Sequence, residues 1–317
     1  MSADVPFANV TIIGLGLIGG SVGLAVQEYM PAARVSGWDA DSGVRAVARN
    51  RGLAHQVPDS LDAAVADADL VMLCVPVRSM GAVAAMLAGK LKPGCVISDV
   101  GSCKVSVAEA IARELPDHVI VPAHPVAGTE HSGPEAGFAS LFQNRWCIVT
   151  PVKGTPPDAT VRVIAFWRRI GATVETMAPD HHDLVLAVTS HVPHLIAYTI
   201  VGTASDLEEV TRSEVIKYSA GGFRDFTRIA ASDPTMWRDV FLSNKDAVLE
   251  ILQRFSEDLT ALQRAIRWGK GDELFSHFAK TREIRRSIIE EGQDDARPDF
   301  GRSDHANPVA EEEPASD

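Results

Sequence analysis

The hydrophobic pattern changes its period partway along the chain. Short apolar, β-branched runs occur at 10–13, 35–38, 70–75, 96–99 and 119–122, separated by helix-like segments rich in Ala, Leu, Arg and Glu at 17–29, 43–51, 80–91 and 104–115. Strands that alternate with helices predict a parallel sheet covered by helices on both faces. We expect residues 146–150 and 173–175, which flank a helix over 159–170, to extend this sheet.

After Pro179 the strand pattern ends and a helical pattern begins. Apolar residues then recur at three- and four-residue spacing, for example at Val248, Ile251, Leu252, Phe255, Leu259 and Leu262. The chain is therefore predicted to be α/β, with a Rossmann-type doubly wound, mostly parallel sheet over 1–178 and an all-α domain over 179–291. This helical half has more apolar faces than one chain readily covers, so we expect a homodimer formed through it.

The net charge of −12 is concentrated at the carboxy terminus. Residues 290–317 hold ten acidic and two basic residues, a net of −8, which leaves −4 for the rest of the chain. With three prolines and few apolar residues, the segment 292–317 is expected to be a disordered acidic tail. A mildly acidic body argues against a nucleic-acid partner, and an anionic substrate would need a local cluster of cations.

Other features of the composition favour a cytoplasmic protein. The apolar runs are shorter than the ~20 residues of a membrane span, and the first residues do not resemble a secretory signal. We therefore expect no membrane partner. Cys74, Cys95, Cys103 and Cys147 are scattered without a zinc-type spacing, which is typical of reduced structural thiols.

A glycine-rich turn follows the first predicted strand and opens the first predicted helix. Its residues are Gly14, Leu15, Gly16, Leu17, Ile18 and Gly19, and this strand–turn–helix context is the one that a dinucleotide fingerprint needs. The helix amino terminus would offer oriented N–H groups to the phosphates. Asp39, at the end of the second strand, is placed to bind both ribose hydroxyls and to repel a 2′-phosphate. We therefore expect NAD as cofactor, with NADP disfavoured but left open by Arg45 and Arg49.

Candidate chemical groups follow the later strands. His124 comes just after the predicted fifth strand, at the sheet edge where ligands bind, and an imidazole there is a candidate base for an alcohol proton. Ser102 follows the fourth strand and can either offer its hydroxyl to the same cleft or cap the next helix.

The helical half adds further polar candidates. His191 and His194 share one helical face near Pro193, and without a convincing third ligand we read them as substrate contacts rather than a metal site. Arg224 and Arg228, four residues apart, could form a carboxylate-binding fork or a solvated ion-pair face with Asp225.

Five motifs, taken together in this order, resemble the prephenate and arogenate dehydrogenases, the TyrA-type family of tyrosine biosynthesis. They are GLGLIGGS, DVGSCK, HPVAGTE, SHVPH and GGFRDFTRIAASDPTMWRD, and the resemblance covers about residues 8–290. Small departures are Cys103, where Val is expected, and Val192, where Leu is common. Neither departure removes a polar group.

The resemblance implies NAD-dependent oxidative decarboxylation of prephenate, arogenate or both. In that reaction His124 accepts the hydroxyl proton and Ser102 hydrogen-bonds the same region. Arg228 holds a substrate carboxylate, while His191 and His194 line the pocket. Supporting or gating roles fall to Thr129, Glu130, Asp225 and Trp237.

Two rival interpretations remain at this point. A β-hydroxyacid dehydrogenase or imine reductase has a similar architecture, but the Lys/Asn pattern typical of its second domain is not evident here. A catalytically silent NAD-binding sensor would leave the joint occurrence of His124, Ser102 and Arg228 unexplained. The preference between prephenate and arogenate is not decided by the sequence.

Overall fold

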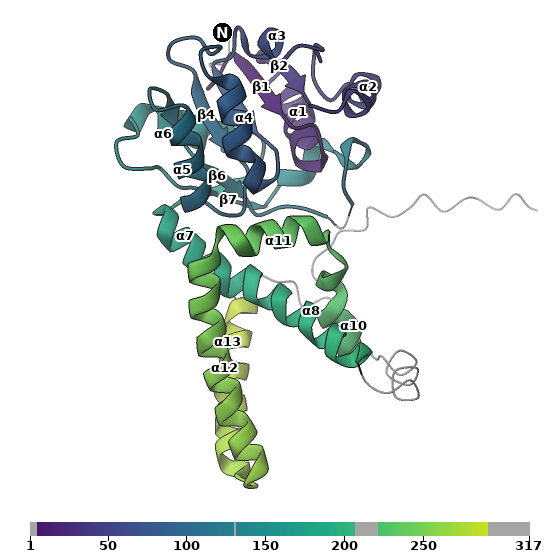
Figure 1. Cartoon of the computed structure of the whole chain (residues 1–317), viewed down its shortest axis with the longest axis vertical. Coiled ribbons are helices and arrows are strands. Elements are labelled where there is room, and N and C mark those ends of the chain that lie inside the picture. Colours follow the sequence, from purple (N-terminus) through teal and green to yellow (C-terminus); the bar gives the residue numbers. More distant parts are fainter. Residues whose placement is uncertain (1–4, 130, 207–220, 291–317) are drawn as a thin grey trace, which may run out of the picture. The chain divides into compact units, whose positions relative to one another are not determined.

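The computed structural model describes residues 5–129, 131–206 and 221–290 (Figure 1). Contacts divide the chain into two compact units, Met1–Leu252 and Gln253–Asp317, which are described separately below. The expected acidic tail and Glu130 lie outside the described residues.

The first unit is built on a five-stranded sheet in which every neighbouring pair is parallel. Its strands are β1 (Asn9–Ile13), β2 (Arg34–Trp38), β3 (Leu70–Leu73), β4 (Val96–Asp99) and β5 (Val119–Ile120), in the order β2-β1-β3-β4-β5. The order reverses between β1 and β3, and open α/β sheets bind ligands at such a switch point. The doubly wound parallel sheet predicted from the sequence is confirmed.

Successive strand residues pack into two different cores because their side chains alternate across the sheet. Ile12 belongs to the core shared with α1 (Leu17–Tyr29) and α6 (Pro157–Arg169), whereas Ile13 belongs to the other. The second core lies against α3 (Leu61–Val65), α4 (Met80–Leu87) and α5 (Val105–Glu114). Helix α2 (Ser42–Arg51) adds Ala48 to the first core. Burial on both faces explains the near-continuous apolar runs of the strands.

The expected extension of this sheet is wrong. Strands β6 (Ala123–Pro125), β7 (Trp146–Val149) and β8 (Thr173–Thr176) form a separate sheet, in which β6 runs antiparallel to β7. Proline supplies no N–H to a ladder, so Pro122 and Pro125 limit β5 and β6 to short pairings. His124 follows β5, as predicted, and lies within the short strand β6, opposite Ile148.

After β8, the described part of the first unit consists mainly of helices, as the sequence predicts. They are α7 (Pro179–Leu186), a π-helical turn (Ala187–His191), α8 (Val192–Ser205), α10 (Gly221–Thr227), a 3-10 turn (Arg228–Ala231), α11 (Pro234–Ser243) and the start of α12 (Lys245–Arg267). The π-helical turn ends just before Pro193, which has no N–H to continue a regular ladder.

The stretch Pro179–Ser205 is long and apolar enough to cross a membrane, judged by length and composition alone. It carries buried polar groups, however, because His182, Asp183 and His191 all lie in the protein interior. A helix packed within protein passes the same test of length and composition, and these buried groups favour that interpretation.

The second unit contains the end of α12 and α13 (Gly271–Glu290). Between the two helices Gly269 adopts a left-handed conformation with φ of +65°, and Lys270 N–H donates to the carbonyl of Ala265. This is the usual glycine-dependent way to end a helix and turn the chain.

Candidate active site

The glycine turn after β1 is built so that two of its residues cannot carry a side chain. Gly14 has φ of +93°, and a Cβ there would lie 2.5 Å from the carbonyl oxygen of Cys74. A Cβ on Gly19 would lie 1.9 Å from the carbonyl oxygen of Gly14. The turn is therefore tight and packs closely against the end of β3.

The same turn leaves an open cradle at the amino terminus of α1. Gly16 is the N-cap residue, no side chain caps the helix, and a Cβ on Gly16 would meet nothing within 4 Å. The first-turn amides, with Leu17 and Ile18 following Gly16, are thus available to an anion. These features fit the diphosphate of a dinucleotide.

Asp39 is fixed beside this cradle. Its Oδ2 accepts the N–H of Leu15 at 2.9 Å, and its Oδ1 accepts the N–H of Asp41 at 3.0 Å. Each carboxylate oxygen has a second lone pair for a ribose hydroxyl. The residues present therefore fit NAD.

Arg45 and Arg49, which kept NADP open, are engaged elsewhere. Both guanidinium groups pair with Asp59, at 3.3 and 2.6 Å. Arg45 also donates to the carbonyl oxygen of Asp39, and Arg49 to that of Val57. Binding a 2′-phosphate would require these contacts to be exchanged, which favours NAD.

A buried ion pair positions the strand that carries His124. Lys104 and Asp99 are both fully buried, and the Lys104 ammonium bonds to the Asp99 carboxylate. The same ammonium donates to the carbonyl oxygen of Ala123 at 2.6 Å, one residue before His124. Burial raises the pKa of Asp99, and the ammonium of Lys104 opposes this shift.

His124 is linked through a second histidine to a carboxylate. Its Nδ1 lies 2.9 Å from Nε2 of His182, and His182 Nδ1 lies 2.8 Å from Oδ1 of Asp183. A carboxylate accepts, so His182 carries its proton on Nδ1 and has a lone pair on Nε2. His124 must then donate from Nδ1, which leaves Nε2 of His124 as an acceptor.

Asp183 also holds the amino terminus of α5. Its two oxygens accept the N–H groups of Lys104 at 2.7 Å and Val105 at 3.0 Å. The cap of this helix thus comes from α7, and the capping role considered for Ser102 is wrong. Ser102 is only half-buried, and it directly precedes the buried residues Cys103 and Lys104.

Burial keeps His124 neutral. Desolvation lowers the pKa of His124 well below its usual value, and the nearby His182, Lys104 and His191 lower it further. The pKa of His182 is lowered by burial too, although Asp183 opposes that shift. His124 therefore has an unprotonated Nε2 at neutral pH, as a general base requires.

His191 presents the opposite hydrogen-bonding character. Asn244 donates from Nδ2 to the carbonyl oxygen of Asp183 at 2.7 Å, which fixes the amide orientation, and the same nitrogen lies 3.1 Å from Nδ1 of His191. His191 must then carry its proton on Nε2, an atom that is buried with no partner among the described residues. Burial lowers the pKa of His191 to about 4, so the ring is neutral and offers one N–H.

His194 and Trp237 extend the cluster. The rings of His194 and Trp237 stack with centroids 3.7 Å apart, and Trp237 also meets His191 edge-on at 6.1 Å. His194 Nδ1 donates to the carbonyl oxygen of Ser190 at 2.8 Å. Trp237 itself is buried against Cys103 and Val240 and therefore acts as a wall that orients both imidazoles.

Arg228 is the cation of this cluster. Burial is the main cause that lowers the pKa of His194, and Arg228 lies close enough to lower it further. Its guanidinium is exposed, and no carboxylate pairs with it among the described residues. Along the series His124, His191, His194 and Arg228, each residue is thus close enough to the one before it to lower that residue's pKa.

Other predicted residues are not brought into this cluster by any contact seen in the described part of the chain. Arg224, 77 % exposed, lies 3.9 Å from Asp225, as in the solvated ion-pair face that was the alternative to a carboxylate-binding fork. Thr129 is exposed, and its hydroxyl bonds to the backbone of His131.

Sequence reasoning missed His182, Asp183 and Asn244. A usable signal was present for two of them, because DHHD at 180–183 opens an otherwise apolar stretch. Nothing in the local sequence marks Asn244, whose role depends on tertiary contact with Asp183.

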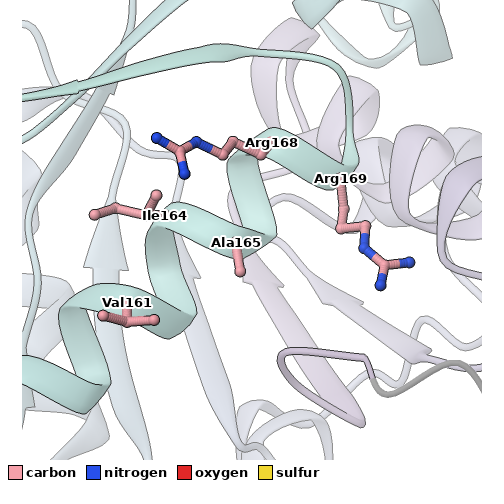
Figure 2. Close-up of a pocket in the computed structure, with 5 residues that line it drawn as sticks. All are labelled: Val161, Ile164, Ala165, Arg168 and Arg169. Atoms are coloured by element: carbon pink, nitrogen blue, oxygen red, sulfur yellow. The ribbon is translucent and has the colours of Figure 1, made fainter.

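A shallow surface hollow also lies along α6, away from these residues. Figure 2 shows its lining side chains, with the guanidinium groups of Arg168 and Arg169 pointing in different directions. The lining is Val161, Ile164, Ala165, Arg168 and Arg169. It contains no acid–base or nucleophilic group, so we assign no chemistry to it.

Two family models match almost the whole of this region. The prephenate dehydrogenase nucleotide-binding domain matches residues 22–176, and the prephenate dehydrogenase dimerization domain matches residues 178–280. Together they cover most of α1, the imidazole cluster and most of the helical half, but not the glycine turn at 14–19.

Individual proteins agree with these matches. A cyclohexadienyl dehydrogenase of Zymomonas mobilis is 47% identical, covering 89% of this chain and 96% of its own. A prephenate dehydrogenase of Bacillus subtilis is 32% identical, covering 88% of this chain and 76% of its own. The crystal structure of Aquifex aeolicus prephenate dehydrogenase in complex with hydroxyphenyl propionate and NAD+ superimposes with a TM-score of 0.83, at 33% identity over 88% of this chain and 98% of that one.

The Asp39 contacts lead to a prediction about cofactor choice. Asp39→Asn keeps an oxygen for the Leu15 N–H but removes the charge, so the Kd for NAD should rise about 10- to 100-fold, as loss of a charge-assisted hydrogen bond implies. Discrimination against NADP should weaken at the same time. Titration of each dinucleotide by fluorescence measures both effects.

Asp67→Asn is the matched control, since Asp67 is an exposed acid and its substitution removes the same charge. It should leave both constants unchanged. Equal NAD affinity in Asp39→Asn and wild type would show that Asp39 does not contact the ribose.

Proposed function

The chain belongs to the prephenate dehydrogenase family, and on this basis we propose that it oxidises prephenate or arogenate with loss of CO2 in tyrosine biosynthesis. Hydride leaves the ring carbon that bears the hydroxyl group, the hydroxyl proton goes to a base, and the ring carboxylate departs as CO2. The ring thereby becomes aromatic, giving 4-hydroxyphenylpyruvate from prephenate or tyrosine from arogenate. Bound NAD would supply the hydride acceptor.

The observation that carries this proposal is the state of His124. It is neutral, its Nε2 is free to accept, and it lies on β6 beyond the carboxyl end of a dinucleotide-binding sheet. An imidazole in this state can take the hydroxyl proton as the carbon–hydrogen bond breaks. Ser102 is available to hydrogen-bond the same hydroxyl.

Recognition of the anionic substrate falls to groups of the helical half. Arg228 offers a guanidinium that pairs with no carboxylate among the described residues, and the buried His191 ring offers one N–H. The ring of His194 stacks on that of Trp237, and the two side chains together form a wall of the proposed pocket. A local cation is needed because the body of the chain is acidic overall.

Thr129, Glu130 and Asp225 remain candidates for a gating role. Thr129 and Asp225 are exposed, and Glu130 lies outside the described residues. Groups at the surface can close over a bound substrate, which is the role that the family resemblance suggests for them.

We also propose that the enzyme is a cytoplasmic homodimer formed through its helical half. Residues 178–280 match a domain described as a dimerization domain, and this half carries exposed apolar side chains at Val188, Ile200, Val201 and Leu249. All four cysteines are free, in keeping with a reducing compartment. Sedimentation of the free chain should give a dimer, and a monomer at micromolar concentration would contradict this.

The test of function is NAD reduction with defined substrates. Wild-type enzyme should form NADH with prephenate, with arogenate, or with both, and parallel kinetics give the preference. A simple 3-hydroxy acid should not be oxidised, which separates this reaction from that of a β-hydroxyacid dehydrogenase. NAD binding without any turnover would instead indicate a sensor.

Substitution of the base tests its role. His124→Asn should lower kcat by about 10²–10⁴, the usual contribution of a general base, with the substrate Kd nearly unchanged. His118→Asn is a control on the same half of the chain, because His118 lies outside the cluster. A His124→Asn enzyme with wild-type kcat would remove His124 from catalysis.

Arg228→Ala should weaken substrate binding. Loss of a charge-assisted hydrogen bond to the substrate carboxylate should raise KM about 10- to 100-fold, with a smaller change in kcat. Arg224→Ala, which removes a neighbouring exposed guanidinium, should leave KM unchanged. Equal KM values for the two variants would show that Arg228 does not hold the substrate.

A further inference from the structure

We propose that His182 and Asp183 are positioning residues for the oxidation, which hold His124 in its basic tautomer and take over the proton that it accepts. This inference rests on the proposed function. It concerns the two groups behind the base, neither of which needs to touch substrate or cofactor.

The hydrogen bonds in the chain that links His124, His182 and Asp183 are all donated in the direction of Asp183. Asp183 has its oxygens occupied by the N–H groups of Lys104 and Val105 as well as by His182, so it acts as an acceptor throughout. His182 therefore points a lone pair at His124, and His124 can only donate from Nδ1. With both rings neutral, Nε2 of His124 has no proton and faces away from this chain as the accepting atom.

The same chain provides a route for the proton. When Nε2 of His124 takes the hydroxyl proton, the Nδ1–H proton can pass to Nε2 of His182 across a 2.9 Å contact. His124 is then neutral again, with its proton on Nε2, and His182 is an imidazolium whose Nδ1–H remains bonded to Asp183. His124 thus gains one proton on Nε2 and passes one from Nδ1 to His182, so the step needs no further reactant.

The neighbouring charged groups favour a positive charge on the His182 ring over one on the His124 ring. His124 faces His182, Lys104 and His191, and each of these disfavours a positive charge on it. His182 faces Asp183 and Asp99, which favour a positive charge, against Lys104, which opposes it. The imidazolium is therefore better placed on His182, next to Asp183, than on His124.

Two substitutions at position 182 separate the holding and proton-accepting roles. His182→Leu removes the acceptor, so His124 should move its proton to Nε2 and lose its basic atom. The kcat should then fall by about 10²–10⁴, close to the effect of wrong-tautomer variants in other enzymes. His182→Gln retains an acceptor oxygen but cannot take a proton, so its kcat should lie between that of wild type and that of His182→Leu.

Two further readouts distinguish this role from simple structural support. The substrate KM and the Kd for NAD should stay within about threefold of wild type in both variants, since a positioning role needs no contact between His182 and either ligand. In His182→Gln the acid limb of the kcat/KM profile should move to higher pH, because one group that lowers the His124 pKa is gone. His181→Gln is the matched control: it changes an adjacent, exposed histidine and should alter none of these values.

Nitrogen-15 NMR of histidine-labelled wild-type chain tests the tautomer without any turnover. At pH 7 the His124 signals, assigned by their loss in His124→Asn, should show a proton on Nδ1 and none on Nε2. This measurement is independent of whether prephenate is the substrate, and it needs no variant at position 182 to fold.

The outcomes are distinct. A His124 proton on Nε2 in the wild type, or a His182→Leu enzyme with wild-type kcat, would overturn the inference. If the wild-type chain forms no NADH with either cyclohexadienol, the proposed function fails, while the NMR result still decides whether His182 and Asp183 set the tautomer.

Discussion

Asp183 accepts hydrogen bonds from three separate parts of the first unit, and the site depends on that convergence. Its carboxylate receives the N–H groups at the start of α5 and the ring of His182, and its carbonyl oxygen receives Asn244. Each buried donor left without a partner would cost about 1–3 kcal/mol. The side chain is almost fully buried, so water cannot replace it. Asp183 thereby fixes two imidazoles at once, one through His182 and the other through Asn244.

The two imidazoles acquire opposite characters from these contacts. His124 is left with an accepting nitrogen and His191 with a donating one, although burial keeps both rings neutral. A base must be free of its proton, whereas a group that holds an anionic or carbonyl oxygen must keep one. The hydrogen-bond partner of each ring therefore decides whether that ring accepts or donates. The position of the ring along the chain does not decide it.

Much of the fold could be predicted from the sequence because its signals are local. The strand–helix alternation, the GLGLIG turn and Asp39 depend on residues close to one another in the chain. The mistaken extension of the sheet arose because apolar β-branched runs reveal a strand but not its partner. The pairing of β6 with β7 joins residues more than twenty positions apart. The contacts of Asp183 join positions about 60–80 residues apart, so no periodicity could reveal them.

The proposal that His124 accepts the substrate proton through Nε2, because His182 and Asp183 occupy its other nitrogen, can be tested directly. The most direct measurement is a crystal structure of this chain with NAD and a phenolic product. The product hydroxyl should lie within about 2.6–3.2 Å of His124 Nε2, with the His124–His182–Asp183 contacts intact and Arg228 on the product carboxylate. A hydroxyl bound at His191 instead, or His124 turned so that Nδ1 faces the product, would contradict it.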